Sequence, residues 1–298
     1  MTLRDDLSRR QTLAGLGGLL LGACAPVDPA PAGQALAALE RSAGGRLGVL
    51  ALCGDRVLEH RAAERFGMCS TFKLALAAAI LRETDAGRLA LDQWVPYSSA
   101  DLVFHAPVTE ANLAKGGMSV GALAEAAQTT SDNVAANLLL KLIGGPEGFT
   151  VRLREMGDPT TRLDRYEPEM NLVPAGELRD TTTPQASARL VARVFSGDLL
   201  EPHSRDLLAT WCVATKTGLE RLRKGLPADW RSGDKTGTAS APGMPNKHND
   251  IAIVWTPKGG IAVIAAYYEA PDHFEEIRAE DNAVLAEVGR IAAKWIGA

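Results

Sequence analysis

Three short motifs contain side chains suited to nucleophilic catalysis. The first, Ser70-Thr71-Phe72-Lys73, places a hydroxyl and an ammonium three residues apart at the start of an apolar run. On a helix this spacing puts both side chains on one face, where a desolvated lysine can take the proton of the serine. The N–H groups at the start of that helix would face a developing oxyanion. Taken alone, the motif also fits a capping serine beside a solvated lysine.

The second and third motifs supply a hydroxyl, an amide and another cation. Ser131-Asp132-Asn133 lies between two helical patterns, where Ser131 and Asn133 could line a pocket. Asp132 would cap the next helix or fix the turn. Asp234-Lys235-Thr236-Gly237-Thr238 is typical of an edge strand that presents a cation, a hydroxyl and backbone N–H groups to an anionic substrate. Each also fits a structural role, as an interhelical turn or as a strand edge that lysine protects from aggregation.

In this order, the Ser-x-x-Lys, Ser-Asp-Asn and Lys-Thr-Gly motifs resemble those of the active-site serine penicillin-recognising enzymes. The resemblance covers nearly all of the chain after its N-terminal segment. It implies an acyl-enzyme at Ser70 and two main branches, the β-lactamases and the D,D-peptidases. A non-catalytic β-lactam sensor domain is a third alternative, but the complete set of motif residues argues against it.

A fourth segment, residues 162–171, resembles the Ω-loop of class A β-lactamases and separates the two branches. Glu167 and Asn171 are four residues apart, so a carboxylate and an amide could hold one water molecule between them. Glu167 would take a proton from that water as it attacks the acyl-enzyme. An ordinary charged surface loop is the alternative interpretation. The resemblance therefore favours an enzyme that hydrolyses penicillins and cephalosporins. Whether it also hydrolyses carbapenems is left open.

The class A resemblance also assigns a role to each motif residue. The expected catalytic residues are Ser70, Lys73, Ser131 and Glu167. The expected substrate-binding residues are Asn133, Asn171, Lys235, Thr236, Thr238, Arg221 and His105. The N–H groups of Ser70 and Thr238 would form the oxyanion hole, and either Lys73 or Glu167 would activate Ser70. This chemistry requires no metal or organic cofactor.

Two departures from the family pattern concern substrate recognition. No arginine follows Lys235 on the next strand, and Arg221 occupies the position from which other members supply a guanidinium for the substrate carboxylate. Arg223 is the competing candidate. In several carbapenem-hydrolysing members Cys69 pairs with a cysteine just beyond the Lys-Thr-Gly motif. Ala239 stands at that place here, so this disulfide cannot form.

The resemblance implies three further details. His105 matches a position often held by an aromatic residue at the mouth of the cleft, although a solvated histidine is an equal alternative. The Glu167-Pro168 peptide bond is expected to be cis. Arg165 is expected to pair with Asp180 across the neck of the Ω-loop.

Strands at both chain ends and helices between them must position these residues. Hydrophobic patterns predict strands at 46–53, 56–61, 250–255 and 261–269, and helices at 33–42, 70–84, 119–129, 132–143, 183–196 and 274–296. This order predicts an α/β fold of the α+β type. An antiparallel sheet built from both chain ends is flanked by helices, and an all-helical lobe is inserted, as in β-lactamase/transpeptidase-like proteins. The expected domains are 34–66 with 214–298, and 67–213 with an Ω-loop at 162–180.

The N-terminal segment is typical of a bacterial export signal. A twin-arginine pattern at 8–13 precedes an apolar run too short to span a bilayer, and residues 21–24 resemble a lipobox that ends in Cys24. These features predict a signal peptide at 1–23, a lipid anchor on Cys24, a linker at 24–33 and a periplasmic location. A plain signal peptide with a chance cysteine is the alternative.

Composition limits the remaining function classes. The 298 residues are 46% hydrophobic and 23% charged, which excludes a disordered chain, and the net charge of −4 argues against a nucleic-acid partner. The five histidines lack the spacing of a zinc hydrolase. We expect a monomer in which Cys53, Cys69 and Cys212 are structural and inert.

Overall fold

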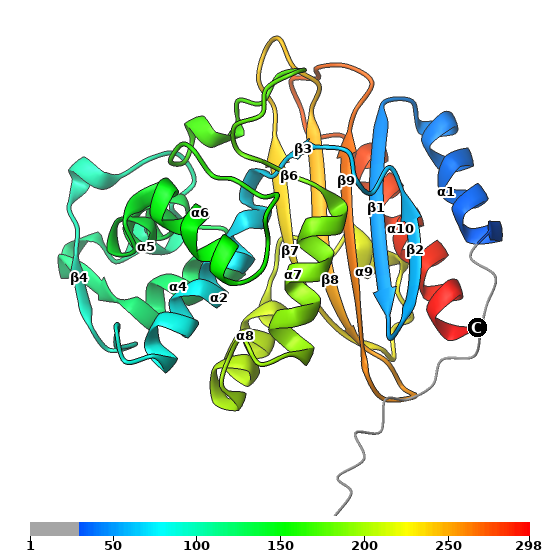
Figure 1. Cartoon of the computed structure of the whole chain (residues 1–298). Helices are drawn as coiled ribbons and strands as arrows, with labels where there is room; N and C mark the ends of the chain where they lie inside the picture. Colours follow the sequence, from blue (N-terminus) through cyan, green and yellow to red (C-terminus); the bar gives the residue numbers. More distant parts are fainter. Residues whose placement is uncertain (1–29) are drawn as a thin grey trace, which may run out of the picture.

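A five-stranded antiparallel sheet lies at the centre of the computed structural model, which describes residues 30–298 (Figure 1). Its strand order is β2-β1-β9-β8-β7, so strands from both ends of the chain share one sheet, as predicted. The Lys-Thr-Gly motif lies on β7, which is an edge strand as predicted. The strands are β1 (Arg46–Cys53), β2 (Arg56–His60), β7 (Arg231–Ala239), β8 (Lys247–Trp255) and β9 (Ile261–Glu269).

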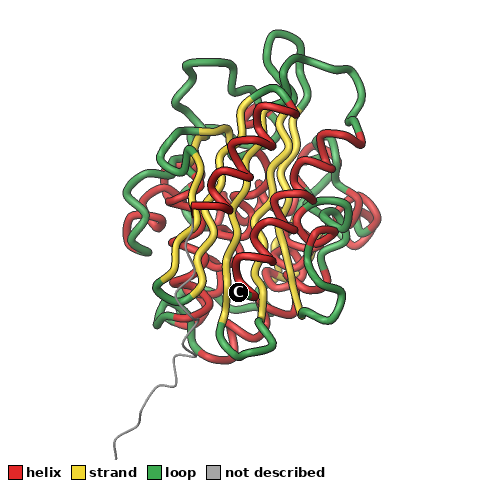
Figure 2. Tube along the Cα trace, turned by 90° about the vertical axis from the view of Figure 1, so that its right-hand side faces the viewer, coloured by secondary structure: helices red, strands yellow, loops and turns green. Residues whose placement is uncertain are grey.

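Both faces of this sheet are buried, each against its own hydrophobic core. Successive side chains of a strand point to opposite sides, so each strand contributes to both cores. On β8, Ile251 and Ile253 join the core shared with the helical half of the molecule, whereas Ala252 and Val254 join the core on the other face. Two helices cover that second face and lie in front of the strands in Figure 2. They are α1 (Ala30–Ala43) and α10 (Ala279–Gly297).

The short helix α9 (Leu222–Gly225) packs against α10 on this second face. The remaining helices lie on the other side of the sheet or beside it (Figure 1). The 3-10 turn η1 (Cys69–Thr71) leads into α2 (Phe72–Asp85), the buried helix of the helical half. The other helices are α3 (Pro107–Ala111), α4 (Val120–Thr129), α5 (Asn133–Leu142), α6 (Gly145–Glu155), α7 (Pro184–Ser196) and α8 (Pro202–Ala214). Short strand pairs join β3 (Phe66–Gly67) to β6 (Thr181–Thr182) and β4 (Trp94–Pro96) to β5 (Gly117–Ser119). The remaining 3-10 turns are η2 (Ser99–Asp101), η3 (Leu113–Lys115) and η4 (Glu169–Asn171).

Several predicted boundaries were wrong for identifiable reasons. The expected linker extended to residue 33, but α1 begins at Ala30, since Pro31 is tolerated in the first turn of a helix. Strand β8 begins at Lys247 rather than at residue 250, because Lys247 is buried in the sheet and its ammonium bonds Glu269 at 3.0 Å. Helix α10 begins at Ala279 rather than at residue 274. The predicted division into two domains stays a prediction.

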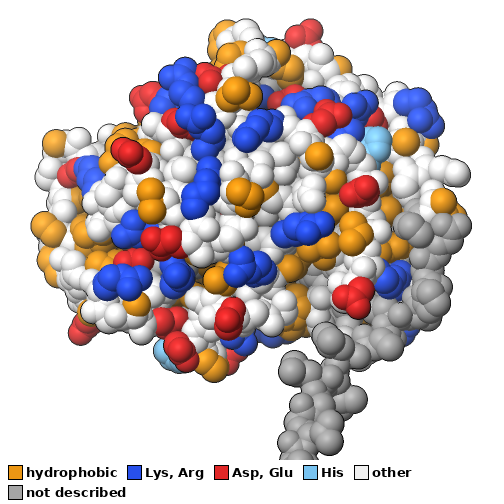
Figure 3. Space-filling view, in the orientation of Figure 1, with side chains coloured by type: hydrophobic (Ala, Val, Ile, Leu, Met, Phe, Trp, Pro, Cys, Tyr) orange, Lys and Arg blue, Asp and Glu red, His pale blue; other side chains and the backbone are white. Residues whose placement is uncertain are grey.

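Charged side chains of both signs lie next to one another on the face of the molecule drawn in Figure 3. At the surface of the Ω-loop, Arg179 pairs with Glu177 at 2.6 Å. Among residues 30–298, none of the helices has both the length and the apolar character that a membrane span requires. The predicted signal peptide and the anchor residue Cys24 lie outside the described residues.

Candidate active site

The structure brings Ser70 and Lys73 into direct contact at the start of α2. Lys73 Nζ donates a hydrogen bond to Ser70 Oγ at 3.0 Å and lies 3.0 Å from Glu167 Oε1. It also donates to the Ser131 carbonyl at 2.8 Å and to Asn133 Oδ1 at 2.5 Å. Burial lowers the pKa of Lys73, although the Glu167 carboxylate opposes this effect. The neutral amine, which can accept a proton, is therefore more accessible here than in a solvated lysine.

Glu167 is buried beside the same serine. Its Oε1 accepts a hydrogen bond from Ser70 Oγ at 3.1 Å, and its Oε2 accepts one from Asn171 Nδ2 at 2.5 Å. The carboxylate and the amide thus lie next to each other within reach of the serine oxygen. One water molecule could contact this carboxylate and an ester formed at Ser70 at the same time.

Asn137 on α5 fixes the backbone of Glu167, a role that was not predicted from the sequence. Its Oδ1 accepts from the Glu167 N–H at 3.0 Å, and its Nδ2 donates to the Glu167 carbonyl at 2.8 Å. The available signal was a single amide within an otherwise apolar stretch, four residues after Asn133 and so on the same helix face.

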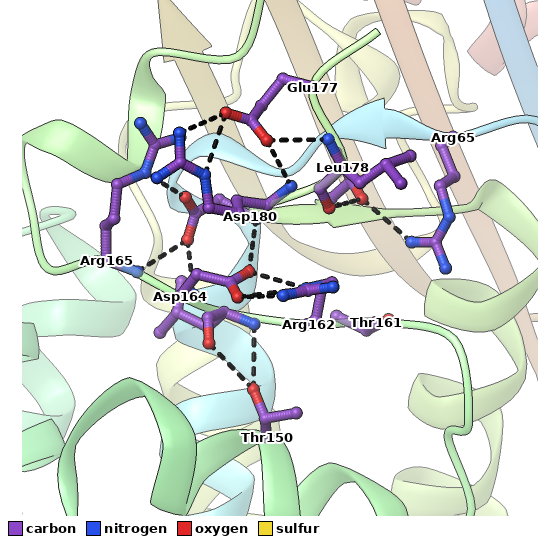
Figure 4. A network of polar contacts seen from close by, with 12 residues as sticks. Arg65, Thr150, Thr161, Arg162, Asp164, Arg165, Glu177, Leu178 and Asp180 are labelled. Carbon is purple, nitrogen blue, oxygen red and sulfur yellow. Dashed lines mark hydrogen bonds and ion pairs between the residues drawn. The ribbon is translucent and has the colours of Figure 1, made fainter.

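The neck of the Ω-loop is closed by carboxylates that accept backbone N–H groups (Figure 4). Asp180 accepts from the N–H groups of Asp164 and Arg165 at 2.7 and 3.0 Å, and from Arg165 Nε at 2.5 Å. Asp164 in turn accepts from the Asp180 N–H at 3.0 Å. The predicted Arg165–Asp180 pair and the predicted cis Glu167-Pro168 bond are therefore confirmed. This network fixes both ends of the loop that carries Glu167.

Ser131-Asp132-Asn133 forms the turn between α4 and α5. Asp132 caps α5, the first of the two roles considered for it, by accepting from the Ala135 N–H at 2.9 Å. It also holds α3 by accepting from the Thr109 N–H at 2.9 Å. Ser131 adopts a left-handed backbone conformation with φ 61°, which is uncommon for serine. This turn directs the hydroxyl of Ser131 and the amide of Asn133 toward Lys73.

Lys235 reaches the same hydroxyl from β7. Its Nζ donates to Ser131 Oγ at 3.1 Å, while Lys73 Nζ lies 3.4 Å from that oxygen. Burial and the positive charge of Lys73 lower the pKa of Lys235 to about 7. The hydroxyl of Ser131 is thus held between two lysines, in a position to pass a proton between them and a third group. Thr236, next along β7, shares a hydrogen bond with Thr217 Oγ1 at 2.7 Å.

Arg221 lies beside the C-terminal end of β7, with its guanidinium buried. Nη2 donates to Thr238 Oγ1 at 2.6 Å, and Nη1 donates to the carbonyls of Gly237 and Asn249 at 3.0 and 2.9 Å. Arg223 is directed elsewhere, to the Thr215 carbonyl at 3.0 Å and to Asp234 at 3.4 Å. Of the two candidate arginines, Arg221 is therefore the one beside Thr238.

Gly237 allows β7 to approach the nucleophile closely. A Cβ at this position would lie 2.7 Å from the Met68 carbonyl oxygen and 3.1 Å from the Ser70 nitrogen. The absence of a side chain thus lets β7 pass close to the Ser70 nitrogen, one residue before Thr238. Cys69, between these groups, has φ 48°.

Two expectations concern side chains outside this cluster. His105 is exposed, and its Nε2 lies 2.9 Å from the Thr130 carbonyl, so the ring rests against the turn that carries Ser131. Cys53, Cys69 and Cys212 are all buried, and burial raises the pKa of the Cys69 thiol to about 12. Within residues 30–298, no group of three or more His, Cys, Asp or Glu side chains is arranged to hold a metal ion.

Known proteins are similar to this chain in sequence and in fold. The family model described as the β-lactamase enzyme family matches residues 31–296. The chain is 45% identical over 263 residues to β-lactamase AST-1 of Nocardia asteroides (88% of this chain, 82% of that protein). It is 45% identical over 279 residues to β-lactamase L2 of Stenotrophomonas maltophilia (92% and 89%).

Solved structures give the same result. An ancestral class A β-lactamase superposes with a TM-score of 0.83 at 48% identity, covering 89% of this chain and 99% of that one. A β-lactamase from Burkholderia vietnamiensis superposes with a TM-score of 0.84 at 43% identity, covering 89% and 96%. The chain therefore belongs to the β-lactamase enzyme family, and it is a serine β-lactamase with the class A fold.

Proposed function

We propose that this β-lactamase hydrolyses penicillins and cephalosporins through an ester on Ser70. The carboxylate of the substrate would bind Lys235, Thr236 and Arg221. The lactam carbonyl of the substrate would accept hydrogen bonds from the N–H groups of Ser70 and Thr238. Asn133 would contact the side-chain amide of the substrate and Asn171 would help to hold the hydrolytic water. His105 would contact substrate side groups at the rim.

Acylation begins with proton removal from Ser70. Its oxygen lies 3.0 Å from Lys73 Nζ and 3.1 Å from Glu167 Oε1, so either group of this coupled pair can receive the proton. The Ser70 Oγ–carbonyl bond forms and the lactam C–N bond breaks. Ser131, held between the two lysines, supplies a proton to the departing nitrogen and recovers one from Lys73.

Deacylation is the step that makes the enzyme a hydrolase. Glu167 takes a proton from a water molecule, whose oxygen attacks the ester carbonyl. The C–Oγ bond breaks, Ser70 recovers its proton and the ring-opened acid leaves. The contact between Glu167 and Ser70 supports this proposal more than any other observation, because a D,D-peptidase has no need of a carboxylate at this place.

A substrate panel tests the proposal. Purified protein should turn over benzylpenicillin and a cephalosporin repeatedly, and Ser70→Ala should abolish both activities. A wild-type protein that binds one equivalent of penicillin and keeps it for hours would instead be a D,D-peptidase. Imipenem belongs in the panel, because Ala239 deprives Cys69 of the disulfide partner found in several carbapenem-hydrolysing enzymes.

We further propose that the enzyme is a monomer in the periplasm, exported by the twin-arginine route and anchored by lipid on Cys24. The order of signal, small residues, cysteine and Pro/Ala-rich segment in the sequence supports this proposal. Cells grown with a clickable palmitate analogue should label the wild type but not Cys24→Ala. Equal labelling of both, or labelling of neither, contradicts a lipid anchor.

A further inference from the structure

A row of three residues crosses the sheet directly beneath the turn that carries Ser70. In the sheet register Gly237 of β7 is opposite Asn249 of β8, which is opposite Tyr267 of β9. Directly opposed residues of antiparallel strands have their side chains on the same face. All three therefore face the segment from Gly67 to Ser70.

Each member of the row contacts this segment in its own way. Gly237 lets the backbone of Met68 and Ser70 approach, as described above. Asn249 Nδ2 donates to the Gly67 carbonyl at 2.8 Å and to the Met68 carbonyl at 3.1 Å. The Tyr267 hydroxyl lies 3.4 Å from Thr71 Oγ1, the hydroxyl that itself bonds the Met68 carbonyl at 2.7 Å.

We propose that Asn249 is a positioning residue, which sets the distance between the two N–H groups of the oxyanion hole. Its side chain holds the two peptide units that precede Met68 and Cys69, just before the Ser70 N–H, while its own strand pairs with the segment of β7 that contains Thr238. One buried amide thus ties the Ser70 donor to the Thr238 donor. This inference rests on the proposed roles of those two N–H groups.

The backbone conformation explains why such a fastening is needed. Cys69 has φ 48°, a left-handed conformation that a cysteine rarely adopts and that the surroundings must enforce. Asn249 is 1% exposed, and both acceptors of its amide lie immediately before this residue. Without these two bonds the turn can relax, which moves the Ser70 N–H relative to Thr238.

The test compares Asn249→Ala with Asn246→Ala. Asn246 is an equally buried asparagine three residues away, whose Nδ2 also donates to a backbone carbonyl, that of Phe274, at 2.8 Å. Both variants lose a buried amide, but only the first loses contact with the Ser70 turn. Enzyme concentration is set by titrating active serines, so that a loss of folded protein does not affect the rates.

Asn249→Ala should lower kcat for benzylpenicillin about tenfold and weaken inhibition by phenylboronic acid about tenfold, because a tetrahedral adduct needs both donors. KM should stay nearly constant, since acylation and deacylation both use the hole and slow together. Asn246→Ala should be less stable to heat with unchanged kcat and inhibition.

Asn249→Ser, which retains one hydroxyl donor in the buried site, should show an intermediate loss and provides the measurement if the alanine variant does not accumulate. Asn249 variants that match Asn246→Ala in kcat and boronate affinity would overturn the proposal. A wild-type enzyme that fails to turn over penicillin would instead contradict the proposed function itself.

Discussion

Replacing Arg221 by glutamine should selectively weaken the recognition of the substrate carboxylate. A guanidinium has five N–H donors, and four of them bond groups of the protein. The acceptors are Asn282 Oδ1, the carbonyls of Gly237 and Asn249, and Thr238 Oγ1. One N–H of Nη2 remains for the substrate, and the bonded Thr238 hydroxyl can donate its own proton to the same carboxylate.

The size of the effect follows from this geometry. A hydrogen bond to a charged partner contributes about 1.5–3 kcal/mol, which corresponds to about 10- to 150-fold in kcat/KM. Arg221 is 6% exposed, so little water is available to replace the lost donor. We therefore expect Arg221→Gln to lower kcat/KM for benzylpenicillin within this range, mainly through KM.

The assay combines the variant with a substrate that lacks the charge. Benzylpenicillin methyl ester should be a poorer substrate than benzylpenicillin for the wild type, and this difference should shrink in Arg221→Gln. Arg223→Gln serves as the matched control, since that guanidinium faces Asp234 and should change the ester penalty little. An unchanged kcat/KM for benzylpenicillin in Arg221→Gln, or an undiminished ester penalty, would refute this role.

Three other outcomes are expected. Burial lowers the pKa of His248 to about 4, so the unfolded chain binds a proton more readily below pH 6.5 and the free energy of unfolding should fall by up to about 3 kcal/mol between pH 6.5 and 4. In urea denaturation, His248→Asn should reduce the dependence of the free energy of unfolding on pH between pH 6.5 and 4. An unaltered pH dependence would contradict the low pKa of His248. The Cys69 peptide should resist iodoacetamide in the native protein and react after unfolding; mass spectrometry that finds rapid native alkylation would contradict its burial. Gly237→Ala should reduce kcat for penicillin, because the new Cβ meets the Met68 carbonyl and the Ser70 nitrogen, and wild-type kinetics would exclude this steric conflict.

The active-site cluster was largely predictable because its chemistry depends on residue types at short spacing. A hydroxyl and an amine three residues apart at a helix start must share a face, and the structure places Ser70 Oγ and Lys73 Nζ 3.0 Å apart. The strands β1 and β9 were also predicted at their observed bounds, since both are continuous apolar runs that end in turns. Local pattern was sufficient for these features.

Other features depend on the tertiary structure and left weak local signals. Helices α6 and α8 were not predicted, since α6 starts with Gly-Pro-Glu-Gly and α8 contains Ser, Thr and Trp, which have lower helix propensity. Asn137 and Asn249 act through partners 30 and more than 180 residues away in the chain. No spacing rule connects residues at such distances, so only the folded structure identifies them.

Glu167, as the base that releases the acyl-enzyme, is central to the proposed mechanism. Glu167→Gln keeps the shape of the side chain and removes its basicity, which should slow deacylation by about 10²- to 10⁴-fold while acylation falls less. Intact-protein mass spectrometry after mixing with excess benzylpenicillin should then show the mass of one bound penicillin on most molecules for minutes. Steady-state turnover equal to that of the wild type, with no adduct detected, would contradict the role of Glu167 as the deacylating base.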